Sequence, residues 1–217
     1  MTLTGRVIRN PGATLEPARI LVKDGSIARI EPIRPSVEDL PVISAGFIDS
    51  HLHPLELGLQ ELFVDLVDAT SIPDVLSRLS AWSRQHPDAV TAFGFNLRPD
   101  LLAEKRYPTA EELDSVASMP LLVYRVDGHS AALNSAGLRA VIRDIATPGV
   151  ELNASGTPTG TLRGQAYEQA SRAFKRRLEP DTVRRALEAA ASKAAAAGTT
   201  TIAALVGTDD LEPDDFR

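Results

Sequence analysis

The fold and the candidate site are best predicted from one stretch, Gly46-Phe47-Ile48-Asp49-Ser50-His51-Leu52-His53-Pro54. In it, an apolar strand ends in His-x-His. Successive side chains alternate between the two faces of a strand, so His51 and His53 project to the same side. Two imidazoles about 7 Å apart along the backbone can converge on one metal ion at roughly 2.0–2.1 Å each. Asp49 falls on that face too, where it can orient a ligand. The alternative is a strand that carries two histidines by chance. The segments on either side of the motif help to decide between a metal site and a chance pair.

The residues before this stretch predict a small β-structure. Two apolar-rich runs, 18–23 and 26–30, flank Asp24-Gly25. Asp-Gly between such runs is a strong hairpin signal. A small β-structure of short strands and turns therefore precedes the His-x-His strand.

The residues after it alternate between strand and helix patterns, which predicts parallel strands joined by right-handed crossovers. A capped helix begins at Ser71, and an alanine-rich helix spans 181–197, with Asp181 as its cap and Gly198 at its end. We also expect a helix over 130–142, a surface excursion over 144–163 and a helix over 165–170. The predicted buried strands of the barrel-like part are 46–51, 89–95, 120–126 and 199–206.

A small β-structure followed at once by a strand ending in His-x-His resembles the amidohydrolase superfamily. Three later segments are similar to its family 3, or YtcJ-like, branch: 90–96, 125–135 with Arg-Val-Asp-Gly-His-Ser at its start, and 156–163. The resemblance implies a β-sandwich followed by a (β/α)8 barrel. The predicted fold is therefore α/β: the N-terminal part of a small β-sandwich (1–45), roughly half of a TIM-like (β/α)8 barrel (46–206), and an acidic tail (207–217).

The same resemblance implies a metal-dependent hydrolase acting on C–N bonds other than peptide bonds in a small-molecule substrate. His51 and His53 would hold a divalent metal ion, zinc first, with iron or manganese as alternatives. Arg125, Asp127 and His129 are the candidate substrate-binding residues, because a guanidinium fork can anchor a carboxylate or carbonyl. The alternative is an ion pair between Arg125 and Asp127.

Two other polar residues receive structural rather than functional predictions. Asn134 is expected to serve as a hydrogen-bonding residue of a helix or loop, and Glu56 to face solvent. Family members commonly carry an acidic residue just after the third segment. Gly164-Gln165 stands there instead, which weakens the expectation of acid–base or metal chemistry at that point.

Only four of the eight strands that a barrel requires are present, and a catalytic zinc site typically has three protein ligands. An open half-barrel would expose strand edges and an apolar face. No catalytic acid or base is expected in this chain. We expect a second polypeptide to supply the remaining strands, ligands and catalytic groups, since the tail after Val206 is short and polar, as at a natural end. The alternatives are a fragment of a longer chain, or a non-catalytic binding or regulatory module on the same scaffold.

Composition narrows the other function classes. The formal net charge of −6 argues against general affinity for nucleic acid or anionic membranes. The absence of cysteine excludes disulfides and thiolate metal sites. No apolar run approaches the ~20 residues needed to span a bilayer, and the N-terminus lacks the apolar region of a signal peptide. A cytoplasmic protein is the expectation.

Overall fold

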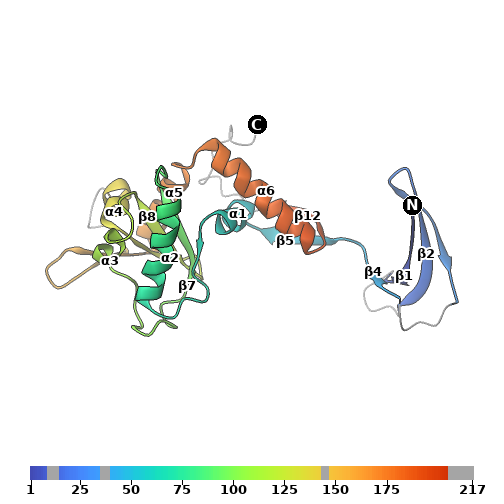
Figure 1. Ribbon diagram of the computed structural model, residues 1–217, viewed down its shortest axis with the longest axis horizontal. Helices are drawn as coiled ribbons and strands as arrows, with labels where there is room; N and C mark the ends of the chain where they lie inside the picture. Colours follow the sequence, from blue (N-terminus) through green and yellow to red (C-terminus); the bar gives the residue numbers. More distant parts are fainter. Residues whose placement is uncertain (9–14, 35–39, 143–146, 205–217) are drawn as a thin grey trace. The chain divides into compact units, whose positions relative to one another are not determined.

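The structure is a computed structural model that describes residues 1–8, 15–34, 40–142 and 147–204. These residues form two compact units (Figure 1). The first comprises Met1–Asp49 with Gly198–Ile202, and the second Ser50–Ala197 with the described residues from Ala203 onward. The predicted tail at 207–217 lies outside the described residues. No helix in the described part is both long and apolar enough to cross a membrane.

The first unit is built on a four-stranded sheet of order β3-β2-β1-β4. Its strands are β1 (Thr2–Val7), β2 (Glu16–Lys23), β3 (Ser26–Pro32) and β4 (Val42–Ile43). Asp24 and Gly25 have φ values of 52° and 75°, as in the tight turn that matches the twist of a hairpin. The β2–β3 pair is antiparallel, so the predicted hairpin is confirmed.

Strands β5 (Phe47–Leu52) and β12 (Thr199–Ala204) pair as a separate two-stranded sheet. The Phe47 N–H donates to the Gly198 carbonyl at 2.9 Å. Only Thr199 and Ile202 of β12 are half-buried and its other residues are exposed, so the prediction of a buried strand here was wrong in this respect. Residues 205–206 of that prediction lie outside the described ranges.

The second unit is a mixed α/β structure around a six-stranded sheet of order β10-β11-β9-β8-β7-β6. Only β6, β7 and β8 run parallel, while β9, β11 and β10 continue the sheet antiparallel. The parallel β/α part is therefore smaller than half of a barrel. The strands are β6 (Val64–Asp65), β7 (Ala92–Leu97), β8 (Leu121–Arg125), β9 (Ser130–Leu133), β10 (Val150–Leu152) and β11 (Pro158–Arg163).

Two sequence predictions in this region were wrong. The segment expected to be helical from 130 begins with β9 and becomes helical only at α4 (Ser135–Val141). The expected surface excursion contains β10 and β11, and Leu162 of β11 is fully buried. In both places sheet pairing overrides local composition: alanines in β9 favour a helix and the glycines and prolines near β11 favour a loop. Residues 143–146 of the excursion lie outside the described residues.

The remaining helices are α1 (Pro54–Leu62), α2 (Ile72–Gln85), α3 (Ala110–Asp114), α5 (Gly164–Lys175) and α6 (Pro180–Ala196). Ser71 caps α2, as expected, by accepting a hydrogen bond from the Asp74 N–H at 3.3 Å. Helix α6 confirms the alanine-rich helix, but its N-cap is Glu179 rather than Asp181. The carboxylate of Asp181 instead pairs with Arg184 at 2.6 Å.

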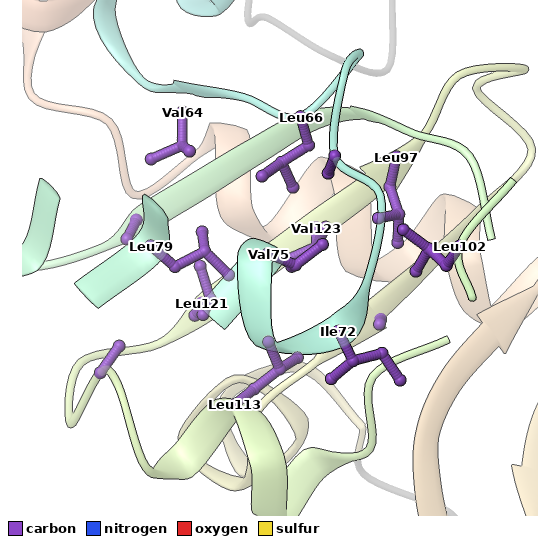
Figure 2. Packing of buried hydrophobic residues seen from close by; sticks show 14 residues of the cluster. Val64, Leu66, Ile72, Val75, Leu79, Leu97, Leu102, Leu113, Leu121 and Val123 are labelled. Carbon is purple, nitrogen blue, oxygen red and sulfur yellow. The ribbon is translucent and has the colours of Figure 1, made fainter. Parts of the chain in front are cut away.

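Alternating side chains of the strands divide the apolar core between the two faces of the sheet. Leu121 and Val123 of β8 pack with α2 on one face (Figure 2), and Leu122 and Tyr124 pack with α1, α5 and α6 on the other. Both faces of the described sheet therefore carry helices, and the edge strands β6 and β10 are only two and three residues long. The expected bare apolar face of a half-barrel is thus absent from this sheet, and short edges limit unwanted strand pairing.

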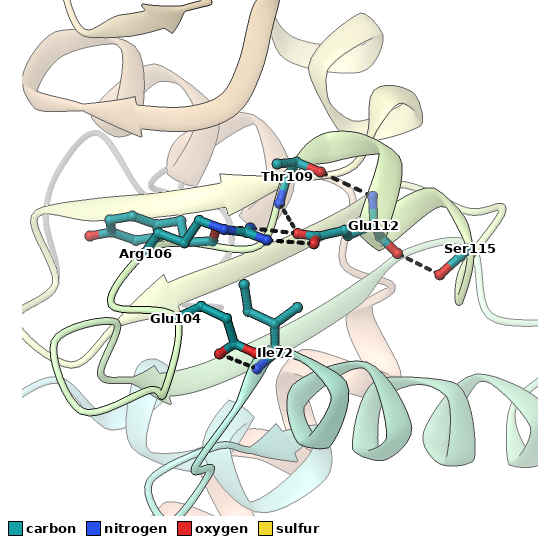
Figure 3. Close-up of polar contacts among 7 residues, drawn as sticks. Ile72, Glu104, Arg106, Thr109, Glu112 and Ser115 are labelled. Carbon is teal, nitrogen blue, oxygen red and sulfur yellow. Dashed lines mark hydrogen bonds and ion pairs between the residues drawn. The ribbon is translucent and has the colours of Figure 1, made fainter.

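The segment between β7 and α3 is held by charged hydrogen bonds (Figure 3). Both Nη atoms of Arg106 donate to the Glu112 carboxylate at 2.8 Å, and Glu104 accepts from the Ile72 N–H at 3.0 Å. Thr109 and Glu112 form a capping box at the start of α3. The Arg106 guanidinium, together with the Thr109 N–H, lowers the pKa of Glu112 to about 2.

Candidate metal-binding and substrate site

The two histidines of the His-x-His motif lie side by side where β5 turns into α1. His51 is in β5, and His53 is the N-cap residue of α1, where its carbonyl accepts from the Leu57 N–H at 3.0 Å. The ring centroids are 5.5 Å apart, with the planes inclined by 72°. Both side chains are exposed. The structure therefore brings the two predicted metal ligands together.

This pair suits a shared metal ion but does not complete a site. Two nitrogens bound at roughly 2.0–2.1 Å to one tetrahedral ion lie about 3.3 Å apart, a spacing that neighbouring imidazoles at this centroid distance can reach. No cluster of three or more His, Cys, Asp or Glu side chains suitable for a metal occurs among the described residues. The residues present thus fit a metal as part of a ligand set. Asp49, the proposed orienting residue, is half-buried and belongs to the first unit.

A cavity of about 160 Å³ opens at the carboxyl ends of β7 and β8, against α1 and α5. Ligand sites of α/β sheets lie at this end of the strands. The lining combines aromatic, amide, hydroxyl and charged side chains: Glu56, Gln60, Phe95, Asn96, Tyr124, Arg125, Val126, Gly128, Tyr167, Ser171 and Lys175.

The three predicted substrate-binding residues occupy the turn after β8, but they do not all reach the cavity. Arg125 lines it, and its Nη1 donates to Asp127. The other carboxylate oxygen of Asp127 accepts from the His129 N–H at 3.1 Å. Asp127 and His129 are absent from the lining formed by the described residues, and the side chain of His129 is exposed. The alternative ion pair between Arg125 and Asp127 is therefore present.

Asn96, at the end of β7, is a site residue that sequence reasoning missed. Its φ of 62° lies in the left-handed region, which non-glycine residues rarely adopt and which often occurs at functional sites. Its Nδ2 donates to Asp65 at 2.9 Å and lies 3.4 Å from the Gln60 Oε1. The available signal was an asparagine, the residue type best suited to this conformation, at a strand end.

Glu56 and Lys175 were also missed. Lys175 Nζ pairs with Glu56 Oε1, and the lysine side chain is only 7% exposed. Glu56 lines the cavity, so the expectation that it faces solvent was wrong. Lys175 directly follows the buried Phe174 on the apolar side of α5, and a lysine there signals a buried charge that needs a partner.

Asn134 is structural, as predicted. Its side chain is fully buried. Its Oδ1 caps α4 by accepting a hydrogen bond from the Gly137 N–H at 2.8 Å, and it also accepts one from the Leu121 N–H at 3.0 Å. Its Nδ2 donates to the carbonyls of Ala117 and Met119, each at 2.9 Å. All four hydrogen bonds are made with backbone groups, so this side-chain amide has no hydrogen-bonding group left to contact a ligand.

The profile of the amidohydrolase family, in its family 3 branch, matches residues 42–215. The chain belongs to this family. AepA from Pectobacterium carotovorum, described as an exoenzymes regulatory protein, is 35% identical over 133 residues. These residues cover 56% of this chain and 29% of AepA. The putative amidohydrolase YtcJ from Bacillus subtilis is 32% identical over 58% of this chain and 25% of its own length. The N-substituted formamide deformylase of Arthrobacter pascens is 34% identical over 54% of this chain and 23% of its own.

Solved structures give the same picture. A metal-dependent hydrolase from Pyrococcus horikoshii superposes with a TM-score of 0.58 at 26% identity, over 74% of this chain and 31% of that one. A second, from Pyrococcus furiosus, gives 0.57 at 26% identity, over 74% and 32%. The chain thus spans about a third or less of the length of the family members that it matches.

Proposed function

We propose that this chain supplies the N-terminal part of a metal-dependent amidohydrolase that hydrolyses a C–N bond other than a peptide bond. The observation that carries the proposal is the pair of neighbouring imidazoles, His51 and His53, at the end of β5. Family membership supports it, as do structural neighbours described as metal-dependent hydrolases and a deformylase among the relatives.

The roles of the chain's own residues follow from their positions. His51 and His53 would hold the ion as neutral imidazoles. The divalent ion held there, zinc before iron or manganese, would when bound lower the pKa of water towards ~7 and so activate it for hydrolysis. Arg125 would bind the substrate carbonyl at the cavity, with Asp127 fixing the plane of its guanidinium. His129, on the same turn, would contact the part of the substrate outside the cavity.

The missing ligands and the catalytic acid or base would come from further barrel strands, supplied by a second polypeptide. The pair described here offers two nitrogen ligands, whereas catalytic zinc sites typically use three protein ligands. A third ligand and a proton-transferring carboxylate are therefore the contributions expected of that partner.

A non-catalytic regulatory module on the same scaffold is the second candidate. Two observations favour it: Gly164-Gln165 stands where the family commonly has an acidic residue, and a relative at 35% identity is described as a regulatory protein. Such a module would not need the two histidines, so their metal affinity separates the candidates.

The test is zinc binding by the purified protein, measured by calorimetry alongside native mass spectrometry of its assembly. The single changes His51→Ala and His53→Ala should each weaken zinc binding by about tenfold or more, since each removes a ligand bond. His86→Ala is the control, because His86 stacks on Trp82 at 4.2 Å and lies outside the motif. Zinc affinity that is the same in wild type and both variants would reject the metal site and favour the regulatory module.

A further inference from the structure

Another cavity, of about 260 Å³, lies at the amino end of β7, whereas the carboxyl-end cavity described above is lined by Phe95 and Asn96 at the other end of that strand. Its walls come from the ends of α1 and α2, the loop that leads into β7, and the connection from α5 to the first turns of α6. All of these segments belong to the second unit. The proposed hydrolysis makes no use of this amino-end cavity.

The apolar part of the lining is rich in rings. His86 stacks on Trp82 with the centroids 4.2 Å apart and the planes inclined by 17°, and Phe63 lies 5.1 Å from Trp82. Leu178 and the exposed Val90 extend this apolar surface. Concave surfaces with apolar walls and a few polar groups are the usual form of small-molecule sites. Because rings gain from stacked and edge-on contacts beyond the area that they bury, this wall favours an aromatic ligand group.

Four charged side chains of the lining form no ion pair or hydrogen bond in the part of the chain that the structure describes: Asp88, Arg177, Glu179 and Arg185. Asp181, one turn before Arg185, is engaged by Arg184 at 2.6 Å instead. The carboxyl-end cavity differs in this respect, because its lysine and arginine each have a carboxylate partner. The amino-end cavity therefore presents both signs of charge, uncompensated, beside apolar walls.

This combination of charges discriminates between classes of ligand. A purely anionic ligand would bring its charge towards the two carboxylates, and a purely cationic one towards the two guanidinium groups. An α-amino acid carries an ammonium and a carboxylate on the same carbon, so it can pair with both kinds of residue at once. Arg177 and Glu179 are only two residues apart in the connection from α5 to α6, so both signs of charge occur on one wall. Charged hydrogen bonds of this kind are among the strong ones in proteins.

We propose that the amino-end cavity binds a free aromatic α-amino acid. Its carboxylate would bind to Arg177 and Arg185, its ammonium to Asp88 and Glu179, and its ring to the apolar wall around Trp82. A bound amino acid would contact α1, α2 and α6 together and so stabilise the second unit. This binding site does not rest on the proposed hydrolysis, because none of its residues is a candidate for that chemistry.

The experiment follows the fluorescence of Trp82, which is the single tryptophan of the chain and lines the cavity. Three ligands are titrated into the protein: L-phenylalanine, 3-phenylpropanoate, which lacks the ammonium, and 2-phenylethylamine, which lacks the carboxylate. Phenylalanine should bind about tenfold more tightly than either of the others, since each of these loses one set of charged hydrogen bonds. Calorimetry of the same titrations measures binding without relying on the fluorescence signal.

Charge-neutralising variants assign the two ends of the ligand. Arg185→Gln should weaken phenylalanine binding by about three- to tenfold and leave that of 2-phenylethylamine unchanged. Glu179→Gln should weaken phenylalanine binding similarly and leave that of 3-phenylpropanoate unchanged. Arg84→Gln is the control, because Arg84 is an exposed arginine of α2 that lies outside the lining and donates to Ser80.

Three results would overturn the proposal. Binding of 3-phenylpropanoate or 2-phenylethylamine as tightly as phenylalanine would show a site for a single charge. Phenylalanine that gives neither heat nor a fluorescence change would show that the cavity takes no amino acid of this class. Phenylalanine affinity that is the same in wild type, Arg185→Gln and Glu179→Gln would place the bound amino acid elsewhere on the protein.

Discussion

Lys175 and Glu56 join two helices that are 119 residues apart in the sequence through an ion pair whose lysine side chain is 93% buried. Glu56 lies in the first turn of α1, three residues after His53. A second ion pair, Lys193 to Glu61, joins the other end of α1 to α6, but its side chains are 54% and 42% exposed. Helix α1 is therefore held by two ion pairs, one with the buried Lys175 and one with the exposed Lys193.

Because His53 is the N-cap residue of α1, we expect the Lys175–Glu56 pair to position the histidine pair. Lys175→Met keeps the apolar bulk and leaves Glu56 without its lysine. It should lower the free energy of unfolding by about 2–3 kcal/mol, less than for a fully buried pair because Glu56 is a third exposed. It should also weaken zinc binding by several-fold. Urea unfolding and zinc titration measure the two effects.

The matched control is Lys193→Met, which breaks an exposed pair at the far end of the same helix. Exposed pairs contribute about 0–1 kcal/mol, so its unfolding free energy should change little and its zinc affinity not at all. The exchanged pair Glu56→Lys with Lys175→Glu should recover part of the zinc affinity. Equal zinc affinity in wild type and Lys175→Met would show that the pair stabilises the fold without positioning His53.

Asn134 should be among the most sensitive polar residues of the second unit. Asn134→Ala removes four hydrogen bonds to backbone groups at a fully buried site, and we expect a loss of about 3 kcal/mol or more. Asn153→Ala is the control, since that side chain bonds to the backbone of Ser155 and Thr157 at an exposed turn and should cost about 1 kcal/mol or less. Similar losses for the two variants in urea unfolding would contradict the assignment of Asn134 as a core residue.

Gly58 lets α1 approach α6 closely. A Cβ at this position would lie 1.7 Å from the Ala186 carbonyl oxygen, so Gly58→Ala must push the two helices apart. We expect a loss of about 2 kcal/mol or more, although alanine is normally the better helix residue. Gly25→Ala, where a Cβ meets nothing within 4 Å, should cost only the left-handed strain of about 1–2 kcal/mol. A Gly58→Ala protein as stable as wild type would mean that this close approach is not required.

The sequence was a good guide wherever one local signal decided the structure. Asp24-Gly25 predicted the hairpin, Ser71 predicted a helix start, and His51 and His53 predicted adjacent imidazoles. Each of these features depends on residues close together in the chain, so turn chemistry, capping and strand alternation suffice.

Features that depend on distant partners were missed. The strand Ser130–Leu133 is stabilised by pairing with β8 and β11, and its alanines by themselves indicate a helix. The carboxyl-end cavity likewise depends on contacts between residues far apart in the sequence. Lys175 pairs with Glu56, 119 residues away, and Asn96 donates a hydrogen bond to Asp65, 31 residues away. No local pattern specifies which carboxylate a buried lysine meets, because that follows from how the helices pack on the sheet.

The Arg106–Glu112 interaction makes a prediction about pH. The pKa of Glu112 is lowered from 4.5 to about 2, first by the Arg106 guanidinium and then by the Thr109 N–H. A carboxyl group whose pKa is lower in the folded state stabilises the fold above its unfolded pKa, and this stabilisation is lost as the pH falls through the folded value. Glu112→Gln should therefore lower the unfolding free energy by about 1–2 kcal/mol at pH 7, and the difference from wild type should shrink between pH 4.5 and 2. Urea unfolding of both proteins across this range measures it, with Glu111→Gln, next to it on α3, as the control. A difference that stays constant with pH would show that the ionised form of Glu112 does not stabilise the helix start.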